Sequence, residues 1–478
     1  MNFQWDFFID FGIISFSLLL ATFLRYKIKF LQKYLIPNSL TAGFFLLVFY
    51  NFFANMDIVS TDNLGTIVYH FLSISFIAMT LKNNPVREKG HKPALFSNSI
   101  SLIFQYAIQA IIGLLVTFIL IKTHYPNLFP SFGFFVPLGF AQGPGQSFAI
   151  GKNWETMGFE GAGSVGLTFA AIGFLYACFG GVWLINYGIK KEWLSKEKLE
   201  LIKDKGIRTG LFKQNDSTPE GSKLTSESEA IDTLTLNFAM VFGVYLLSFL
   251  LLKLITFGLS LLGQTGVDLG NTLWGINFVF SALMAIVVKS VLKLFKINYI
   301  MDNGMLNRVT GFSVDFMVTA SIGAISIAVL WQYIIPIIIT SLVAGFAVIV
   351  TVPWFCSRIY KDHQFDRMLL IYGASTGTMP TGLALLRVVD PDFETPAASD
   401  YMFSTGITFP LVIPFILAIN LPAYAHTKGD FLYFWLALGI SFAYLIFSLI
   451  SFLLIARRKA FHQPSQAFYR IKEEIHGM

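Results

Sequence analysis

Long apolar runs separated by short polar segments make up most of the chain. Most of them reach the roughly 20 residues that a helix needs to cross about 30 Å of hydrocarbon. This pattern predicts an all-α polytopic membrane protein. The runs lie at about 7–24, 35–54, 65–81, 95–121, 132–151, 162–187, 234–262, 271–292, 309–330, 333–356, 367–387, 399–424 and 431–455.

The composition agrees with this class. Of 478 residues, 55% are hydrophobic and only 13% are charged, whereas soluble domains carry about 25% charged residues. A soluble enzyme, a nucleic-acid binder and a disordered chain are therefore poor fits, and no HExxH motif is present. We expect no cofactor and no nucleic-acid partner. Cys178 and Cys356 lie inside apolar runs, which predicts buried thiols.

Residues 188–232 differ from the rest, because they contain nine basic and nine acidic residues. This composition predicts a solvated linker, helical near 193–205. The linker divides the chain into a first half, 1–187, and a second half, 233–425. Residues 426–478 then form an extra span and a polar tail.

Two of the apolar runs are unusual in their glycine and proline content. Residues 133–151 contain five glycines and two prolines, and residues 373–387 contain three glycines and one proline. Helix interiors disfavour glycine by about 1 kcal/mol and proline by about 3 kcal/mol. Such backbone is tolerated at membrane depth only inside protein or beside a wet cavity. We therefore expect 132–151 and 367–387 to be re-entrant; the alternative is a glycine-rich face for helix packing.

The distribution of basic residues supports this assignment. If neither run crosses the membrane, basic and non-basic loops alternate along the whole chain, as the positive-inside rule requires. If only one crossed, the alternation would fail beyond it, and if both crossed, the basic linker would lie outside. The predicted topology in the cell (inner) membrane has the N-terminus outside and five spans per half. The linker and the C-terminus are cytoplasmic.

Five spans per half place the second half upside down relative to the first, which is the inverted-repeat plan of secondary transporters. A shift of 235 residues aligns the two glycine-rich runs, with Ala149 on Ala384 and Lys152 on Arg387. Interrupted segments at matching positions of two halves indicate a transport site.

Three stretches carry a resemblance to a known family. GFAQGPGQSFAIG, VGLTFAAIGFLYACFGGVWLINY and YGASTGTMPTGLALLR, with the order of the spans, resemble the sodium/glutamate symporter family over roughly residues 5–425. The resemblance implies two re-entrant loops that meet at mid-membrane, sodium-coupled glutamate uptake and a homodimer. Its implied partners are a small organic anion, sodium as the coupling ion and the lipid bilayer.

The candidate substrate-binding residues lie in the two glycine-rich runs, where helix N-termini and side-chain oxygens could hold a carboxylate. The alternative is that these polar groups cap their own hairpins. Arg387 could bind the substrate carboxylate, or pair with Asp390 or Asp392. The residues are Gln142, Gly143, Gly145, Gln146, Ser147, Ser375, Thr376, Gly377, Thr378, Thr381 and Arg387.

The candidate cation-binding residues are Asp315, Thr319 and Ser321 in the 309–330 run. A carboxylate with nearby hydroxyls suits a sodium or proton site, whereas an interfacial acid paired with Arg308 is the alternative. The sequence thus favours a sodium-coupled symporter of a small carboxylate. A proton- or sodium-linked exchanger is the second hypothesis, and a non-transporting receptor or assembly protein is the third.

The topology can be tested by labelling introduced cysteines from each side of the membrane. Positions in 190–230 and 457–470 should react from the cytoplasm, and positions in 57–62 and 264–268 from outside, because basic loops stay inside. Labelling of the 188–232 segment from outside would contradict the inverted-repeat scheme.

Overall fold

The computed structural model describes residues 5–53, 61–83, 94–193, 209, 211, 221–390 and 395–468, and no strand occurs among them. The all-helical prediction is therefore confirmed. The first half contains α1 (Asp6–Lys27), α2 (Lys29–Lys33), α3 (Asn38–Phe52), α4 (Thr61–Leu81), α5 (Leu95–Thr123), η1 (Phe132–Phe134), η2 (Pro137–Ala141), α6 (Pro144–Glu155), α7 (Ala162–Leu175), η3 (Tyr176–Gly180) and α8 (Gly181–Lys190). The remainder contains α11 (Thr233–Ser260), α12 (Gln264–Gly275), α13 (Asn277–Leu294), η4 (Asn298–Ile300), α14 (Asn303–Gly323), α15 (Ile327–Ile359), α16 (Gln364–Thr376), α17 (Met379–Leu386), α18 (Ala397–Ala418), α19 (Leu421–Lys428), α20 (Leu432–Ala456) and η5 (Arg457–Phe461).

Within the described residues, nine helical segments are long and apolar enough to cross a membrane. Their outer surfaces are apolar; on α11, for example, Leu246, Leu250, Leu254 and Phe257 are exposed. A contiguous exposed apolar surface of this extent suits lipid. The nine segments are Phe7–Lys27, Thr61–Leu81, Leu95–Thr123, Ala162–Lys190, Thr233–Ser260, Asn277–Leu294, Ile327–Ile359, Pro410–Lys428 and Leu432–Phe461.

Two of the eleven predicted spans are helical but are too short or too polar to be counted among these nine segments. Helix α3 has only 15 residues, and α14 carries polar residues such as Asn307, Arg308 and Asp315 within its 21 residues. Helix α14 packs closely against α3 and α4. Its polarity is tolerated because much of α14 is covered by protein instead of lipid.

Several element boundaries differ from the prediction. The turn expected at 331–332 lies at 324–326, because the Ser326 hydroxyl caps α15 by accepting a hydrogen bond from the Val329 N–H at 3.4 Å. The expected loop 263–270 belongs largely to α12, and the 399–424 run is interrupted at Asn420, between α18 and α19. Of the predicted helix at 193–205, only Trp193 is among the described residues.

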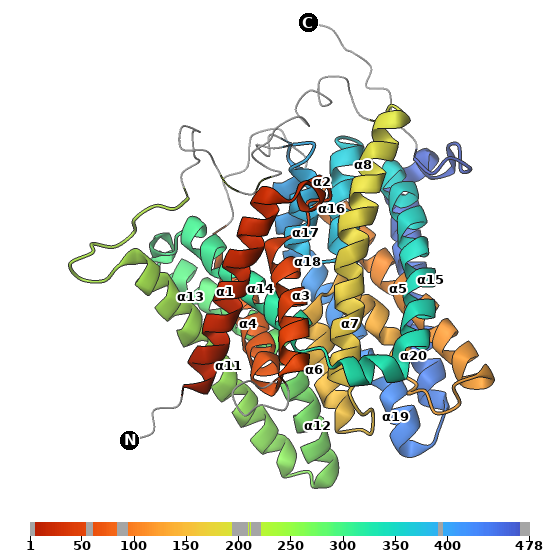
Figure 1. Cartoon of the computed structure of the whole chain (residues 1–478), viewed down its shortest axis with the longest axis horizontal. Helices are drawn as coiled ribbons and strands as arrows, with labels where there is room; N and C mark the ends of the chain where they lie inside the picture. Colours follow the sequence, from red (N-terminus) through yellow and green to blue (C-terminus); the bar gives the residue numbers. More distant parts are fainter. Residues whose placement is uncertain are drawn as a thin grey trace, which may run out of the picture.

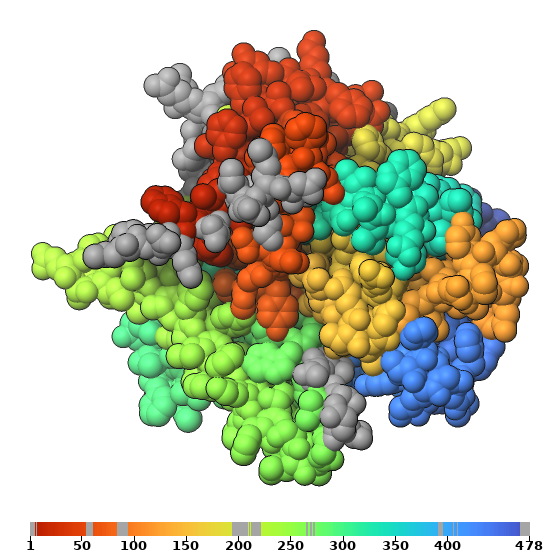
Figure 2. All heavy atoms as spheres, turned by 60° about the horizontal axis from the view of Figure 1, so that its bottom comes forward, coloured from red at the N-terminus to blue at the C-terminus, as the bar shows by residue number. Residues whose placement is uncertain are grey.

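The first glycine-rich run folds back on itself as hairpin 1, which extends from Phe132 to Glu155. One arm contains η1 and η2, and the other is α6. The arms lie side by side, since the rings of Phe135 and Trp154 are 4.9 Å apart. The Trp154 indole also donates a hydrogen bond to the Asn420 side chain at 2.8 Å. Figure 2 shows the face on which α6 and α7 meet segments of the second half.

The second run forms hairpin 2 from α16 and α17, residues 364–386. These helices cross at two glycines: a Cβ built on Gly373 would lie 2.6 Å from the Cα of Gly382. At its base, the buried Arg367 pairs with Asp400 of α18 at 2.9 Å. The Asp400 carboxylate also accepts a hydrogen bond from the Ala94 N–H at 3.1 Å. Hairpin 2 is thus tied to α18 and to the first turn of α5.

The hairpins approach each other from opposite ends of the molecule. In Figure 1, α6 lies in the lower half, and α16 and α17 lie in the upper half. One offset of 235 residues relates their elements: η2 ends at Ala141 and α16 at Thr376, and α6 begins at Pro144 and α17 at Met379. The helices that follow, α7 and α18, begin at Ala162 and Ala397 with the same offset.

The glycine crossing of hairpin 2 makes a prediction about stability. A Cβ at Gly382 would lie 2.5 Å from the Leu370 carbonyl oxygen, so Gly382→Ala should cost about 1–3 kcal/mol through overpacking. Thermal unfolding in detergent should show a lower Tm. Gly439→Ala in α20 is the matched control, because a Cβ there would meet nothing within 4 Å and alanine favours a helix. An equal effect of the two substitutions would show that the crossing is not tight.

Candidate functional site

The tips of the two hairpins touch. Gly143 has φ +88°, a backbone conformation that glycine adopts without strain. A Cβ built on Gly143 would lie 2.8 Å from the Cγ2 atom of Thr378. These two residues immediately precede α6 and α17 and are related by the same 235-residue offset. The contact therefore joins equivalent points of the two halves.

Each tip also presents a helix N-terminus. Helix α6 begins with Pro144, and α17 has Pro380 at its second position. Proline is favoured in a first helical turn, where its missing N–H is not needed. The remaining N–H groups of a first turn have no acceptor inside the helix, and the macrodipole places partial positive charge there. Two such ends at one point create an environment that favours an anion.

A cavity of about 320 Å³ lies beside the tips. Hairpin 1 contributes Gln142 and Gln146 to its wall, and hairpin 2 contributes Thr378 and Leu383. Most of the other lining residues come from α4, α5, α13, α14 and α18. Its volume is within the range of small-molecule sites. We call it the central cavity.

The two glutamines of the central cavity have buried polar atoms without a hydrogen-bond partner among the described residues. Both side-chain amide atoms of Gln142 and the Oε1 atom of Gln146 are in this state, and the Gln146 side chain is only 6% exposed. An unsatisfied buried amide atom costs about 1–3 kcal/mol. A polar solute in the cavity would satisfy these atoms.

Several of the predicted hydroxyls bind their own hairpin instead. Ser147 donates to the Pro144 carbonyl at 3.0 Å, and Thr376 donates to the Tyr372 carbonyl at 2.8 Å. The Thr378 and Thr381 hydroxyls are paired at 3.3 Å. The Ser375 carbonyl accepts a hydrogen bond from Gln109 of α5 at 2.8 Å.

Among the predicted substrate-binding residues, the central cavity thus brings together Gln142, Gln146 and Thr378. The glycines Gly143, Gly145 and Gly377 form or adjoin the two tips. These glycines have no side chain that could bind a solute, so they contribute only to the backbone conformation of the tips.

Arg387 is not among the residues that line the central cavity. It is exposed at the end of α17, one helical turn beyond the lining residue Leu383. That separation is about 6 Å along the helix axis. Its proposed role in binding a carboxylate stays a prediction.

Asp315 and Thr319 meet at Ser39, on a different face of α14 from the central cavity. The Ser39 side chain interacts with the Asp315 carboxylate, and the Thr319 hydroxyl donates to the Ser39 carbonyl at 3.2 Å. Ser321 is not part of this group, because its hydroxyl donates to the Val318 carbonyl of its own helix. The structure adds Ser39 of α3, which sequence reasoning missed.

Other residues that line the central cavity were not predicted from the sequence. They include Lys82, Tyr106, Tyr401 and Thr408. For α14, the spacing of residues along the sequence could have identified the face that lines the cavity. Asn307, Thr310, Gly311, Val314 and Met317 recur at helical spacing on one face, and all five line the cavity. Their mixed polarity concealed the pattern.

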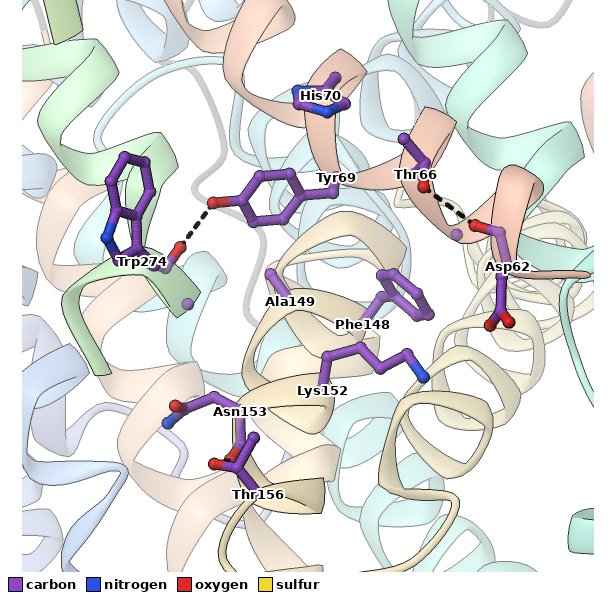
Figure 3. A pocket seen from close by; sticks show the side chains of 12 residues that line it. Asp62, Thr66, Tyr69, His70, Phe148, Ala149, Lys152, Asn153, Thr156 and Trp274 are labelled. Carbon is purple, nitrogen blue, oxygen red and sulfur yellow. Dashed lines mark hydrogen bonds between the residues drawn. The ribbon is translucent and has the colours of Figure 1, made fainter. Parts of the chain in front are cut away.

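A second cavity, of about 600 Å³, lies on the other side of hairpin 1. We call it the outer cavity, after the side that the predicted topology gives it. Figure 3 shows its walls, formed by the first half of α4, the second half of α6 and the end of α12. The Tyr69 hydroxyl of α4 donates a hydrogen bond to the Trp274 carbonyl of α12 at 2.7 Å and so joins these two helices.

Apolar contacts between α4, α6 and α14 separate the two cavities. The Phe148 ring packs directly on Gly65. One turn before Phe148, Gly145 packs against Leu72 and Met317: a Cβ there would lie 2.7 Å from Leu72 Cδ1 and 2.9 Å from Met317 Sδ. We call these contacts the apolar barrier.

Comparison of the chain with family models, with curated proteins and with solved structures finds no match in any of the three.

The contact between the two hairpin tips leads to a prediction about stability, which can be tested without knowledge of the function. Gly143→Ala should destabilise the protein by about 1–3 kcal/mol, because the new Cβ is strained at φ +88° and overlaps Thr378. Thr378→Ser removes the overlapping methyl and keeps the hydroxyl. In the double variant it should recover part of the loss, with a coupling energy of about 0.5 kcal/mol or more in a thermal-unfolding cycle. Strict additivity would show that the tips do not touch.

Proposed function

We propose that the protein is a secondary active transporter that moves a small organic anion, such as glutamate, together with sodium. The observation that carries this proposal is the meeting of two helix N-termini beside a cavity with unpartnered amides. Discontinuous helices whose N-termini point at an anionic group form the binding sites of many secondary transporters.

The arrangement of the hairpins supports an inverted-repeat transporter. Both hairpins are interrupted at positions that differ by 235 residues, and they come from opposite ends of the molecule. In this proposal both are re-entrant, and the five spans of one half repeat the five spans of the other in inverted orientation. The resemblance to the sodium/glutamate symporter family points to the same plan.

The two cavities support alternating access. With the predicted topology, the central cavity extends along α4 and α14 toward the cytoplasmic ends of these helices, so this conformation faces inward. The outer cavity ends at the apolar barrier, where Phe148 packs on Gly65. Separation of α4 from α6 would join the outer cavity to the hairpin tips.

For the coupling cation, we propose the group around Ser39. A carboxylate, a hydroxyl and a backbone carbonyl are the hard oxygen ligands that a small cation prefers. Asp315, Thr319 and Ser39 supply these three kinds of oxygen. The site lies on α14, and another face of the same helix lines the central cavity. A shift of α14 would therefore link cation binding to the shape of the cavity.

Counterflow in proteoliposomes tests the proposal. Vesicles loaded with unlabelled L-glutamate should take up labelled L-glutamate, and an inward sodium gradient should drive net uptake. Vesicles without protein are the control. Absence of both activities with correctly folded protein would reject the function for this substrate, and counterflow without sodium dependence would reject the coupling.

The glutamine amides provide a prediction at residue level. Gln146→Leu removes a group that we expect to hydrogen-bond the anion, and such bonds to charged groups are worth about 1.5–3 kcal/mol. The half-saturation concentration for L-glutamate in counterflow should therefore rise about tenfold to a hundredfold. Gln105→Leu is the matched control, because Gln105 is buried in α5 and contacts Thr351 at 3.3 Å. Equal behaviour of the two variants would place the site elsewhere.

A further inference from the structure

Lys82 is the only residue with a formal charge among the described residues that line the central cavity. The other lining residues are apolar or carry neutral hydroxyl or amide groups. Lys82 follows the last residue of α4 directly and is half-buried.

The position of Lys82 is set by the face of α4 that borders the cavity. Leu72, Ser75, Phe76, Met79 and Lys82 line the cavity at helical spacing. Leu72 is at the apolar barrier beside hairpin 1. Lys82 is ten residues farther along the chain, or about 15 Å along the helix axis. Lys82 thus marks the end of the cavity that lies away from the tips. In the predicted topology this is the cytoplasmic end, which we call the inner mouth.

The backbone around Lys82 is held by neighbouring elements. The Lys289 ammonium of α13 donates to the carbonyls of Thr80, at 3.0 Å, and of Lys82. The Asn83 N–H donates to the Asn303 side chain at 2.7 Å. The Lys82 ammonium itself forms no ion pair with any carboxylate in the described part of the chain. No carboxylate in the described part of the chain therefore neutralises its charge.

The charged residues of the adjoining elements are mostly basic. Helix α13 contains Lys289 and Lys293, and α14 contains Arg308, whereas Asp302, which precedes α14, caps that helix by accepting a hydrogen bond from the Met305 N–H. Burial lowers the pKa of Lys82 to about 8. The ammonium is thus charged at neutral pH and loses its proton as the pH rises through that value.

We propose that Lys82 is the charge-selecting residue of the central cavity, which attracts anionic solutes at the inner mouth and disfavours cationic ones. This inference rests on the proposed function only for the identity of the solute as a transported carboxylate. The selection itself is a property of the cavity.

Charged thiol reagents test the inference without knowledge of the substrate. Met79 lines the cavity one turn before Lys82, so Met79→Cys places a thiol beside the proposed charge. The measured quantity is the rate of modification by the anionic sulfonatoethyl methanethiosulfonate divided by the rate for the cationic trimethylammonioethyl reagent. The native Cys178 and Cys356 are buried, and protein without Met79→Cys gives the background.

Adding Lys82→Gln to Met79→Cys should lower this ratio about three- to tenfold, as loss of one charge within roughly 6 Å in a partly aqueous site predicts. Lys82→Arg should preserve the ratio. Lys190→Gln is the matched control and should also leave it unchanged, because Lys190 is exposed at the end of α8 and does not line the cavity. With Lys82 present, the ratio should fall as the pH rises through about 8, after correction for the intrinsic rates of both reagents.

Three results would overturn the inference: no labelling of Met79→Cys from the cytoplasmic side, a ratio unaffected by Lys82→Gln, or a larger effect of Lys190→Gln. The failure of the proposed function is seen separately, as absence of glutamate counterflow in the wild-type protein. Where counterflow is present, Lys82→Gln should raise the half-saturation concentration for L-glutamate about tenfold. It should leave competition by the neutral L-glutamine unchanged.

Discussion

The contact between Gly143 and Thr378 imposes the main constraint on the structure. Two helices begin there, so N–H groups without intrahelical acceptors are concentrated in the protein interior. Purely apolar packing around them would leave those groups unsatisfied at a cost of a few kcal/mol. The chain instead places Gln142 and Gln146 at this point and leaves a cavity beside them. The cavity is thus a consequence of breaking two helices at the same place.

The two hairpins are held in different ways, and the difference bears on how the molecule could move. At its base, hairpin 2 is tied by the buried Arg367–Asp400 pair, and leaving one such charge buried without its partner costs about 3–5 kcal/mol. The apolar barrier consists of contacts made by Phe148, Leu72 and Met317. Such contacts are non-directional and can re-form in a shifted position. A conformational change is therefore easier at the barrier than at the base of hairpin 2, which favours motion of α4 relative to α6.

Sequence reasoning located the two interruptions because glycine and proline have strong local effects. The prediction that 132–151 and 367–387 differ from ordinary spans depended only on backbone preferences, and the 235-residue offset recurs in the helix boundaries. It missed α12, because Gln264–Gly275 contains three glycines and several polar residues, which are typical of a loop. It could not foresee Ser39 beside Asp315, since that contact joins residues far apart in the chain. Lys82 lies one residue beyond the apolar run at 65–81, so the hydropathy pattern does not connect it with a site, although it lines the cavity on the same helix face as Leu72 and Met79.

The placement of formal charge follows from the energetics of burial. A full positive charge at the hairpin tips would carry a large desolvation cost in a low-dielectric interior. Helix N-termini and glutamine amides provide partial charges there at a much lower cost. A lysine at the end of a helix can keep its ammonium near water while its stem covers apolar surface, and Lys82 occupies such a position directly after α4. The cavity thereby combines partial charges at its deep end with one full charge at its mouth. Because a full charge acts over a longer range than a dipole, it would govern the approach of an anion, while the tips would govern its final orientation.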